Sequence, residues 1–108
     1  MGDRICLSFV NDKYKERSPC LYAHWAGMDL LDEVDAFWEC NREAIRDEPA
    51  NVMVNFISYI REGKIVDGGY YLYQNEDCAC SPDDNGFWEF DTETGKYREY
   101  RKHDWEKE

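Results

Sequence analysis

Hydrophobic and polar residues alternate near the start of the chain, in residues 4–10 (RICLSFV). The alternation places every second side chain, beginning with Ile5, on one face of an extended segment, so it predicts a β-strand. A polar stretch at residues 11–19 (NDKYKERSP) is typical of a loop, and a second strand is expected at residues 20–25 (CLYAHW). Together they predict an N-terminal β-hairpin.

From Met28 onward the period of the apolar residues changes from two to between three and four, which indicates an α-helix. We expect Asp29 to cap this helix, and further acidic residues in its first turns face the positive end of the helix dipole. The apolar stripe consists of Leu30, Leu31, Val34, Phe37, Trp38 and Ile45.

A second helix is predicted within residues 46–63 (RDEPANVMVNFISYIREG). Asp47 suits its N-cap, Pro49 its first turn and Gly63 its C-terminal stop. Its apolar stripe consists of Val52, Met53, Phe56, Ile57 and Ile60. Two amphipathic helices joined by a short connection are expected to cover one face of a sheet.

Three more strands are expected in the rest of the chain. Residues 67–75 (DGGYYLYQN) give a turn and a strand, whereas 87–90 (FWEF) and 96–100 (KYREY) form a hairpin around DTETG. The order β-β-α-α-β-β-β predicts an α+β fold, with a largely antiparallel sheet and two helices on one face. We expect one domain over residues 1–101 and a charged tail over 102–108, which frays unless Trp105 anchors it.

Composition and charge narrow the functional classes. The chain has 108 residues, 43% of them hydrophobic, which is enough for the core of one domain. A net charge of −11 disfavours direct binding to nucleic acid, because phosphate groups would be repelled. The absence of a long apolar run and of a signal-peptide pattern predicts a cytoplasmic protein without a membrane span, and its five cysteines are then expected to be reduced.

His24 is the most conspicuous polar residue in an apolar segment. In a strand it lies about 13 Å from Cys20 on the same face, too far for a thiolate–imidazole pair. We expect its ring to hydrogen-bond to Asp29 or Asp32 and thereby hold the joint between strand and helix. His24, Trp25 and Gly27 are therefore assigned a structural role, and no catalytic residue is assigned.

Cys78 and Cys80 are the best metal-ligand pair in the sequence, with His24 as a third candidate. Two thiolates fall short of the four ligands of a structural zinc site, so no metal and no cofactor are predicted. The acidic loop around Gly86 also fails as a calcium site, because Thr92 occupies the position that needs a bidentate carboxylate. Motifs for nucleotide binding and for serine hydrolases are absent from the sequence.

The segment LYAHWAGMDLLDEV, together with RDEPANVMVNFISYI and DNGFWEFDTETG, resembles a family of small uncharacterised prokaryotic and phage-encoded proteins. Members of that family carry a strand ending in Leu-Tyr-x-His-Trp-Gly-Gly directly before a helix, and Ala26 stands here where they have glycine. The resemblance implies the strand-to-helix core and an origin in a virus or mobile element. It implies no activity.

Aromatic residues in the last three predicted strands exceed what one sheet face needs. We expect the face without helices to expose a protein-binding surface, and our candidates for it are Tyr71, Tyr73, Trp88 and Tyr97. Cross-strand packing or self-association as a homodimer explains the same surplus equally well.

The leading hypothesis is therefore a non-enzymatic module that binds another protein. One alternative is an acidic mimic of nucleic acid that inhibits a nucleic-acid-binding protein, using carboxylates of the first helix: Asp32, Glu33, Asp35, Glu39 and Glu43. The other is a metal-binding or hydrolytic protein that uses His24 with Cys78 and Cys80.

Overall fold

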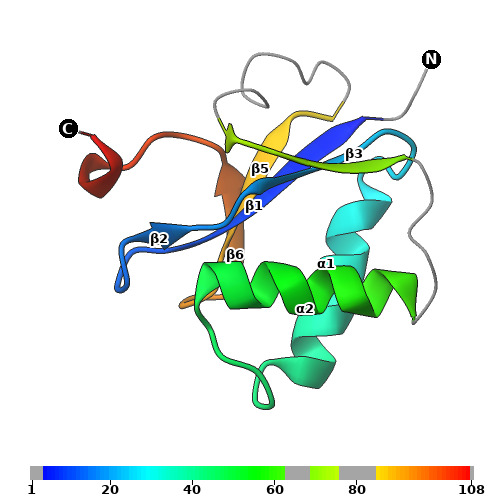
Figure 1. The fold of residues 1–108 in the computed structure, drawn as a ribbon, viewed down its shortest axis with the longest axis horizontal. Helices are drawn as coiled ribbons and strands as arrows, with labels where there is room; N and C mark the ends of the chain where they lie inside the picture. Colours follow the sequence, from blue (N-terminus) through cyan, green and yellow to red (C-terminus); the bar gives the residue numbers. More distant parts are fainter. Residues whose placement is uncertain (1–3, 63–68, 76–84, 108) are drawn as a thin grey trace.

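The computed structural model describes residues 4–62, 69–75 and 85–107. The fold is α+β, with two helices and a six-stranded, mostly antiparallel sheet (Figure 1). The elements in chain order are β1 (Ile5–Asn11), β2 (Glu16–Arg17), β3 (Cys20–Ala23), α1 (Asp29–Asn41), α2 (Pro49–Arg61), β4 (Tyr70–Tyr73), β5 (Phe87–Asp91), β6 (Lys96–Glu99) and a 3₁₀ turn, η1 (Asp104–Glu106). The predicted fold class is confirmed.

The sheet has the strand order β4-β3-β1-β5-β6, and β2 extends the β1 hairpin. β1 is the central strand and pairs antiparallel with β3 and parallel with β5, so Cys6 lies opposite Phe87. The parallel pair joins the two hairpins predicted from the sequence into one sheet.

Helices α1 and α2 pack on the same face of this sheet (Figure 1). Phe9 of β1 lies at the centre of the core, with edge-to-face contacts to Phe56 of α2 and Phe90 of β5 at 5.9 and 5.8 Å. The core also contains the predicted apolar residues of the first turns of α1 and those of α2. We call this the helix face of the sheet and the opposite one the outer face.

Several predicted boundaries are corrected. Helix α1 ends at Asn41, before Ile45, and its N-cap is Met28 rather than Asp29. The N-cap of α2 is Glu48, while Pro49 occupies the first turn as expected. Asp47 does not cap the helix, and its carboxylate instead accepts a hydrogen bond of 2.8 Å from the hydroxyl of Tyr14. Gly63, the predicted stop of α2, lies outside the described residues.

The strand predicted for residues 20–25 ends at Ala23, because the chain turns at Gly27. Gly27 has φ +58°, in the left-handed region that glycine adopts without strain, and α1 begins two residues later. The tail follows the alternative in which Trp105 anchors it, because its indole N–H donates to Asp12 at 2.8 Å. His103 is buried and η1 packs beside the sheet, so residues 103–106 are anchored rather than frayed.

Candidate functional site on the outer face of the sheet

The outer face is not the uniformly open surface that the sequence suggested. In β1, the side chains of Cys6, Ser8 and Val10 are completely buried, although neither helix covers them. In β5, Glu89 is also completely buried. Exposed aromatic side chains are confined to the end formed by β3 and β4, whereas β2, β5, β6 and the tail form a charged end.

The aromatic end consists of three tyrosines from neighbouring strands. Tyr22 of β3 lies directly opposite Tyr71 of β4, and Tyr73 is the next outward residue along β4. The three ring centroids are 6.0 Å apart in every pair. Tyr71 is 47% and Tyr73 43% exposed, so two of the predicted partner-binding residues do lie at the surface.

Trp88 and Tyr97 lie elsewhere. Both are half-buried and pack against the helix-face core, because their positions in β5 and β6 point away from the outer face. The hydroxyl of Tyr97 donates to the backbone oxygen of Leu31 at 2.8 Å and to Asp35 at 2.9 Å. Burial, together with the neighbouring Asp35 carboxylate, raises the pKa of this phenol. Trp88 and Tyr97 therefore hold the core together and do not share a surface with Tyr71.

His24 forms the inner border of the aromatic end. The Tyr22 hydroxyl and Nδ1 of His24 share a hydrogen bond of 2.7 Å, in place of the expected hydrogen bond to Asp29 or Asp32. The Trp25 ring meets the imidazole edge-on at 4.3 Å, and the His24 backbone N–H donates to the carbonyl of Gly69 at 2.7 Å. These contacts connect the end of β3 to the start of β4, which is a structural role.

One prediction about the cysteines is wrong, and another concerns residues outside the described part of the chain. Cys20 is disulfide-bonded, so the prediction that all five thiols are reduced is wrong. Cys6 and Cys40 are free, and burial raises the pKa of the Cys6 thiol to about 11. Cys78 and Cys80 lie outside the described residues. Within the described part of the chain, no group of three His, Cys, Asp or Glu side chains is arranged to hold a metal ion.

The charged end is centred on Glu89, which sequence reasoning missed. Its carboxylate accepts hydrogen bonds from Arg17 of β2 at 2.8 Å, from Nε2 of His103 at 2.7 Å and from Nε of Arg98. Arg17 also donates to Glu106 of the tail at 2.7 and 2.9 Å. We call Arg17, Glu89, Arg98, His103 and Glu106 the charge cluster.

The charge cluster is saturated with internal partners. Burial by itself would raise the pKa of Glu89, but the hydrogen bonds from Arg98, Arg17 and His103 outweigh burial and lower it. The Arg17 guanidinium further donates to Ser8 and to the carbonyl of Arg101, and it stacks over the Tyr100 ring at 4.6 Å. These hydrogen bonds fasten the tail to the sheet.

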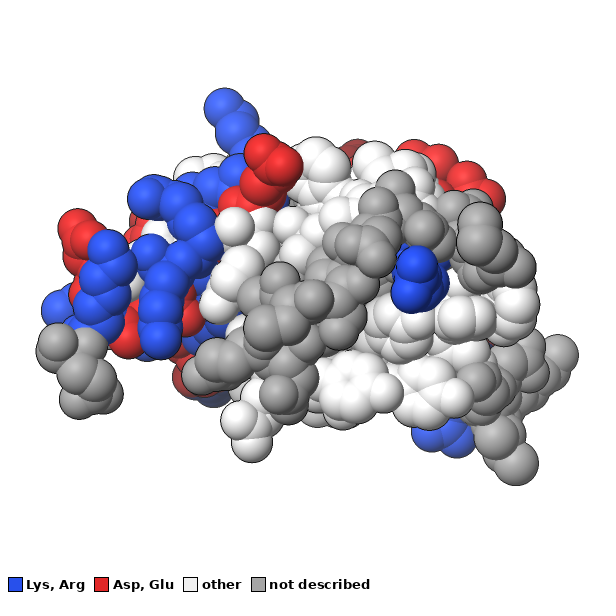
Figure 2. All heavy atoms as spheres, turned by 90° about the horizontal axis from the view of Figure 1, so that it is seen from above, with Lys and Arg blue, Asp and Glu red and all other residues white. Residues whose placement is uncertain are grey.

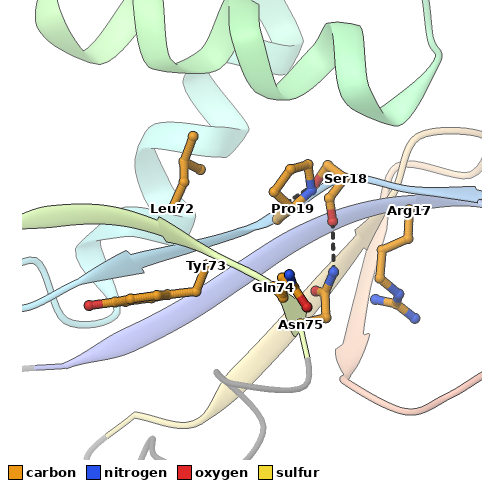
Figure 3. A pocket seen from close by; sticks show the side chains of 7 residues that line it. All are labelled: Arg17, Ser18, Pro19, Leu72, Tyr73, Gln74 and Asn75. Atoms are coloured by element: carbon orange, nitrogen blue, oxygen red, sulfur yellow. Dashed lines mark hydrogen bonds between the residues drawn. The ribbon is translucent and has the colours of Figure 1, made fainter.

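Two neighbouring hollows lie beside Arg17 and Asn75, each with a volume of about 470 Å³. The first, mainly apolar, is lined by Arg17, Ser18, Pro19, Leu72, Tyr73, Gln74 and Asn75 (Figure 3). The second, mainly polar, is lined by Lys15, Arg17, Asn75, Tyr100, Lys102, Trp105 and Glu106. Arg17 and Asn75 line both, so the hollows meet there, and we call the pair the outer groove.

The carboxylates proposed for nucleic-acid mimicry are spread over two segments. Asp32, Asp35 and Glu39 are exposed on α1, whereas Glu43 follows the end of the helix. Glu33 is partly buried, and this burial, with Asp29 and Glu62 nearby, raises its pKa.

Comparison with known proteins gives no relative: no family model, no curated protein and no solved structure matches the chain. The resemblance to the small prokaryotic and phage-encoded family thus stays a prediction. A search of the described residues finds no helix with the length and apolar character to cross a membrane.

Proposed function

We propose that this chain is a non-enzymatic protein-binding module whose docking surface is β4, the strand at the edge of the sheet. The observation that carries the proposal is that three consecutive large side chains of β4, Tyr71, Leu72 and Tyr73, are 43–52% exposed. Tyrosine and leucine side chains of this size are expensive to leave in water, and tyrosine is enriched at the centres of protein interfaces.

The surroundings of β4 suit a docking role. On the helix face, a hollow of about 270 Å³ lies between β4 and α2, where Leu21, Ile57 and Leu72 contribute apolar lining. At the other end of the strand lies the apolar hollow of the outer groove, with Pro19, Leu72 and Tyr73 (Figure 3). Leu72 lines both hollows, so a partner that covers this residue would bury apolar surface on both sides of the strand.

The proposal is tested by selecting binders from a library of random displayed peptides on the purified full chain. Affinities of synthetic copies are then measured by fluorescence anisotropy for the original chain and for Leu72→Asp. We expect at least tenfold weaker binding to Leu72→Asp, because a buried unpaired carboxylate is costly at an interface.

Val54→Asp is the matched control, because Val54 is 66% exposed on α2 and lines neither hollow. Its affinity should equal that of the original chain. Selection that yields no binders, or binders insensitive to Leu72→Asp, contradicts the proposal. So does a stable homodimer of the original chain that Leu72→Asp dissociates in sedimentation equilibrium, because β4 would then serve self-association.

A further inference from the structure

Basic residues outnumber acidic ones in the described lining of the polar hollow, whereas the chain as a whole is acidic. The chain has 24 acidic and 13 basic residues, yet among the described residues Lys15, Arg17 and Lys102 line this hollow together with a single acidic residue, Glu106. Both carboxylate oxygens of Glu106 already accept hydrogen bonds from Arg17. Figure 2 shows the lysine and arginine side chains gathered at the end of the molecule that bears the tail in Figure 1.

The side chains of Lys15 and Lys102 differ from that of Arg17, because no ion pair within the described part of the chain involves them. Arg17 donates to Ser8, Glu89, Glu106 and the carbonyl of Arg101, whereas neither lysine takes part in an ion pair among residues 4–62, 69–75 and 85–107. Two ammonium groups at one hollow are therefore available to an anionic group from outside.

The backbone conformation at Lys15 bears on the role of its ammonium group in this hollow. Lys15 has φ +53°, a left-handed conformation that costs a residue with a side chain about 1 kcal/mol and costs glycine nothing. The turn between β1 and β2 thus carries a lysine where glycine would fit better. The side chain it keeps there lines the polar hollow.

Asn75 stands where the two hollows meet. Its side-chain N–H donates to the carbonyl of Ser18 at 2.9 Å, which fixes the amide orientation (Figure 3). The amide oxygen Oδ1 is buried and has no hydrogen-bond partner in the described structure. The unpaired acceptor is shielded from solvent, so the contribution of Asn75 to the groove is the fixed position of its amide between the two hollows.

We propose that the partner presents an extended segment with an acidic side chain that binds between Lys15 and Lys102. This inference rests on the proposed function. An apolar side chain of the same segment occupies the hollow at Pro19, Leu72 and Tyr73. At physiological ionic strength charges are screened beyond about 8 Å, so an anionic group in the hollow responds mainly to the charges that line it, and Glu106 among these is already paired with Arg17.

The test uses peptide arrays in which every peptide carries one leucine or phenylalanine and one variable residue: aspartate, glutamate, phosphoserine, serine or lysine. Binding of the full chain should follow the order acidic, neutral, basic. The phosphoserine arm compares a doubly charged anion with a carboxylate. Each of Lys15→Gly and Lys102→Gln should weaken binding of acidic peptides about three- to fivefold and leave the serine peptides unchanged.

Two variants separate charge effects from misfolding. Lys15→Gly relieves the left-handed backbone, so its melting temperature should match or exceed that of the original chain. Lys13→Gln, in the same turn but outside the lining of the hollow, should leave every affinity unchanged. The charge reversal Lys102→Glu should shift the preference toward lysine peptides.

Failure of this inference is distinguishable from failure of the proposed function. Peptides that lose binding in Leu72→Asp but bind equally well to the lysine variants overturn the acidic-segment assignment and leave the docking surface on β4 intact. A preference for lysine peptides in the original chain overturns it too.

Discussion

The two ends of the outer face use large polar and aromatic side chains in opposite ways. At the charged end, Glu89 and His103 are buried and every principal group has an internal partner. At the aromatic end, Tyr71 and Tyr73 stack on each other and remain nearly half exposed. The difference teaches that the charged end contributes stability, whereas the aromatic end has contact area available to another molecule.

The largest loss of stability is expected for the substitution Glu89→Leu at the charged end. The substitution leaves Arg17 and Arg98 without the carboxylate between them, and breaking a buried charge pair costs about 3–5 kcal/mol. We expect the free energy of unfolding, measured with urea, to fall by that amount. Glu99→Leu on the exposed side of β6 is the control, with an expected change within about 0.5 kcal/mol. A loss below 1 kcal/mol for Glu89→Leu would show that the charge cluster is not a stabilising unit.

Lowering the pH should weaken the charged end selectively. Hydrogen bonds from arginine lower the pKa values of Glu89 and Glu106 below their ordinary value despite burial. The unfolded chain then takes up protons at a higher pH than the folded chain does. This contribution to stability is therefore complete above about pH 4.5 and is lost as the pH falls through the lower folded-state pKa values. Urea midpoints from pH 7 to pH 3 should decline most steeply below pH 4.5, and less steeply in Glu89→Gln.

The substitutions Tyr71→Ala and Tyr73→Ala test the role of the aromatic end. Because both rings are largely exposed and hydrogen bonds of the charge cluster do not involve them, each change should cost less than about 1 kcal/mol of unfolding free energy. Peptide binding should nevertheless fall at least fivefold in each variant. Equal losses of stability at the two ends would refute the contrast, and thermal melts alongside the anisotropy measurements provide the comparison.

The smallest expected effect is a difference in the rates at which the cysteine thiols are alkylated. Under non-reducing conditions iodoacetamide should modify exposed Cys40 first, Cys6 far more slowly and Cys20 not at all. Burial and a pKa near 11 keep the Cys6 thiol protonated and inaccessible at neutral pH. Peptide mapping by mass spectrometry gives the order. Alkylation under denaturing conditions after rapid acid quenching of cells that express the chain tests the predicted cytoplasmic location, because Cys20 is modified there only if the compartment has kept it reduced.

Local patterns were sufficient to predict both helices, five of the six strands and the fold class, because alternation and helical periodicity depend on neighbouring residues. They missed β2, which lies in the stretch predicted to be a loop, and η1 in the tail. They could not predict that β1 and β5 pair in parallel, since that contact joins Cys6 to Phe87. The face assignment of Trp88 and Tyr97 failed for the same reason. Alternation separates the two sides of a strand, but the strand's neighbours decide which side meets the helices.

The charge cluster illustrates the limit for sites. Glu89 lies between Trp88 and Phe90 in the segment FWEF, which is otherwise apolar, and this position of a carboxylate was a usable signal. Its partners Arg17 and His103 come from distant segments, so the sequence alone did not connect them. The partner of His24 was missed although it is only two residues away. Tyr22 competes with the acidic residues of α1, and only the strand geometry decides between them.

The central position of β1 has a consequence for biogenesis. β1 can form its hairpin with β3 as soon as both leave the ribosome, but its other edge stays open until β5 has been synthesised. During that interval the nascent chain exposes a hydrogen-bonding edge and an Arg17 without its carboxylate. Closure of the sheet is therefore a late and non-local event, which predicts slow folding for a chain of this size and a period in which chaperones have a strand edge to protect.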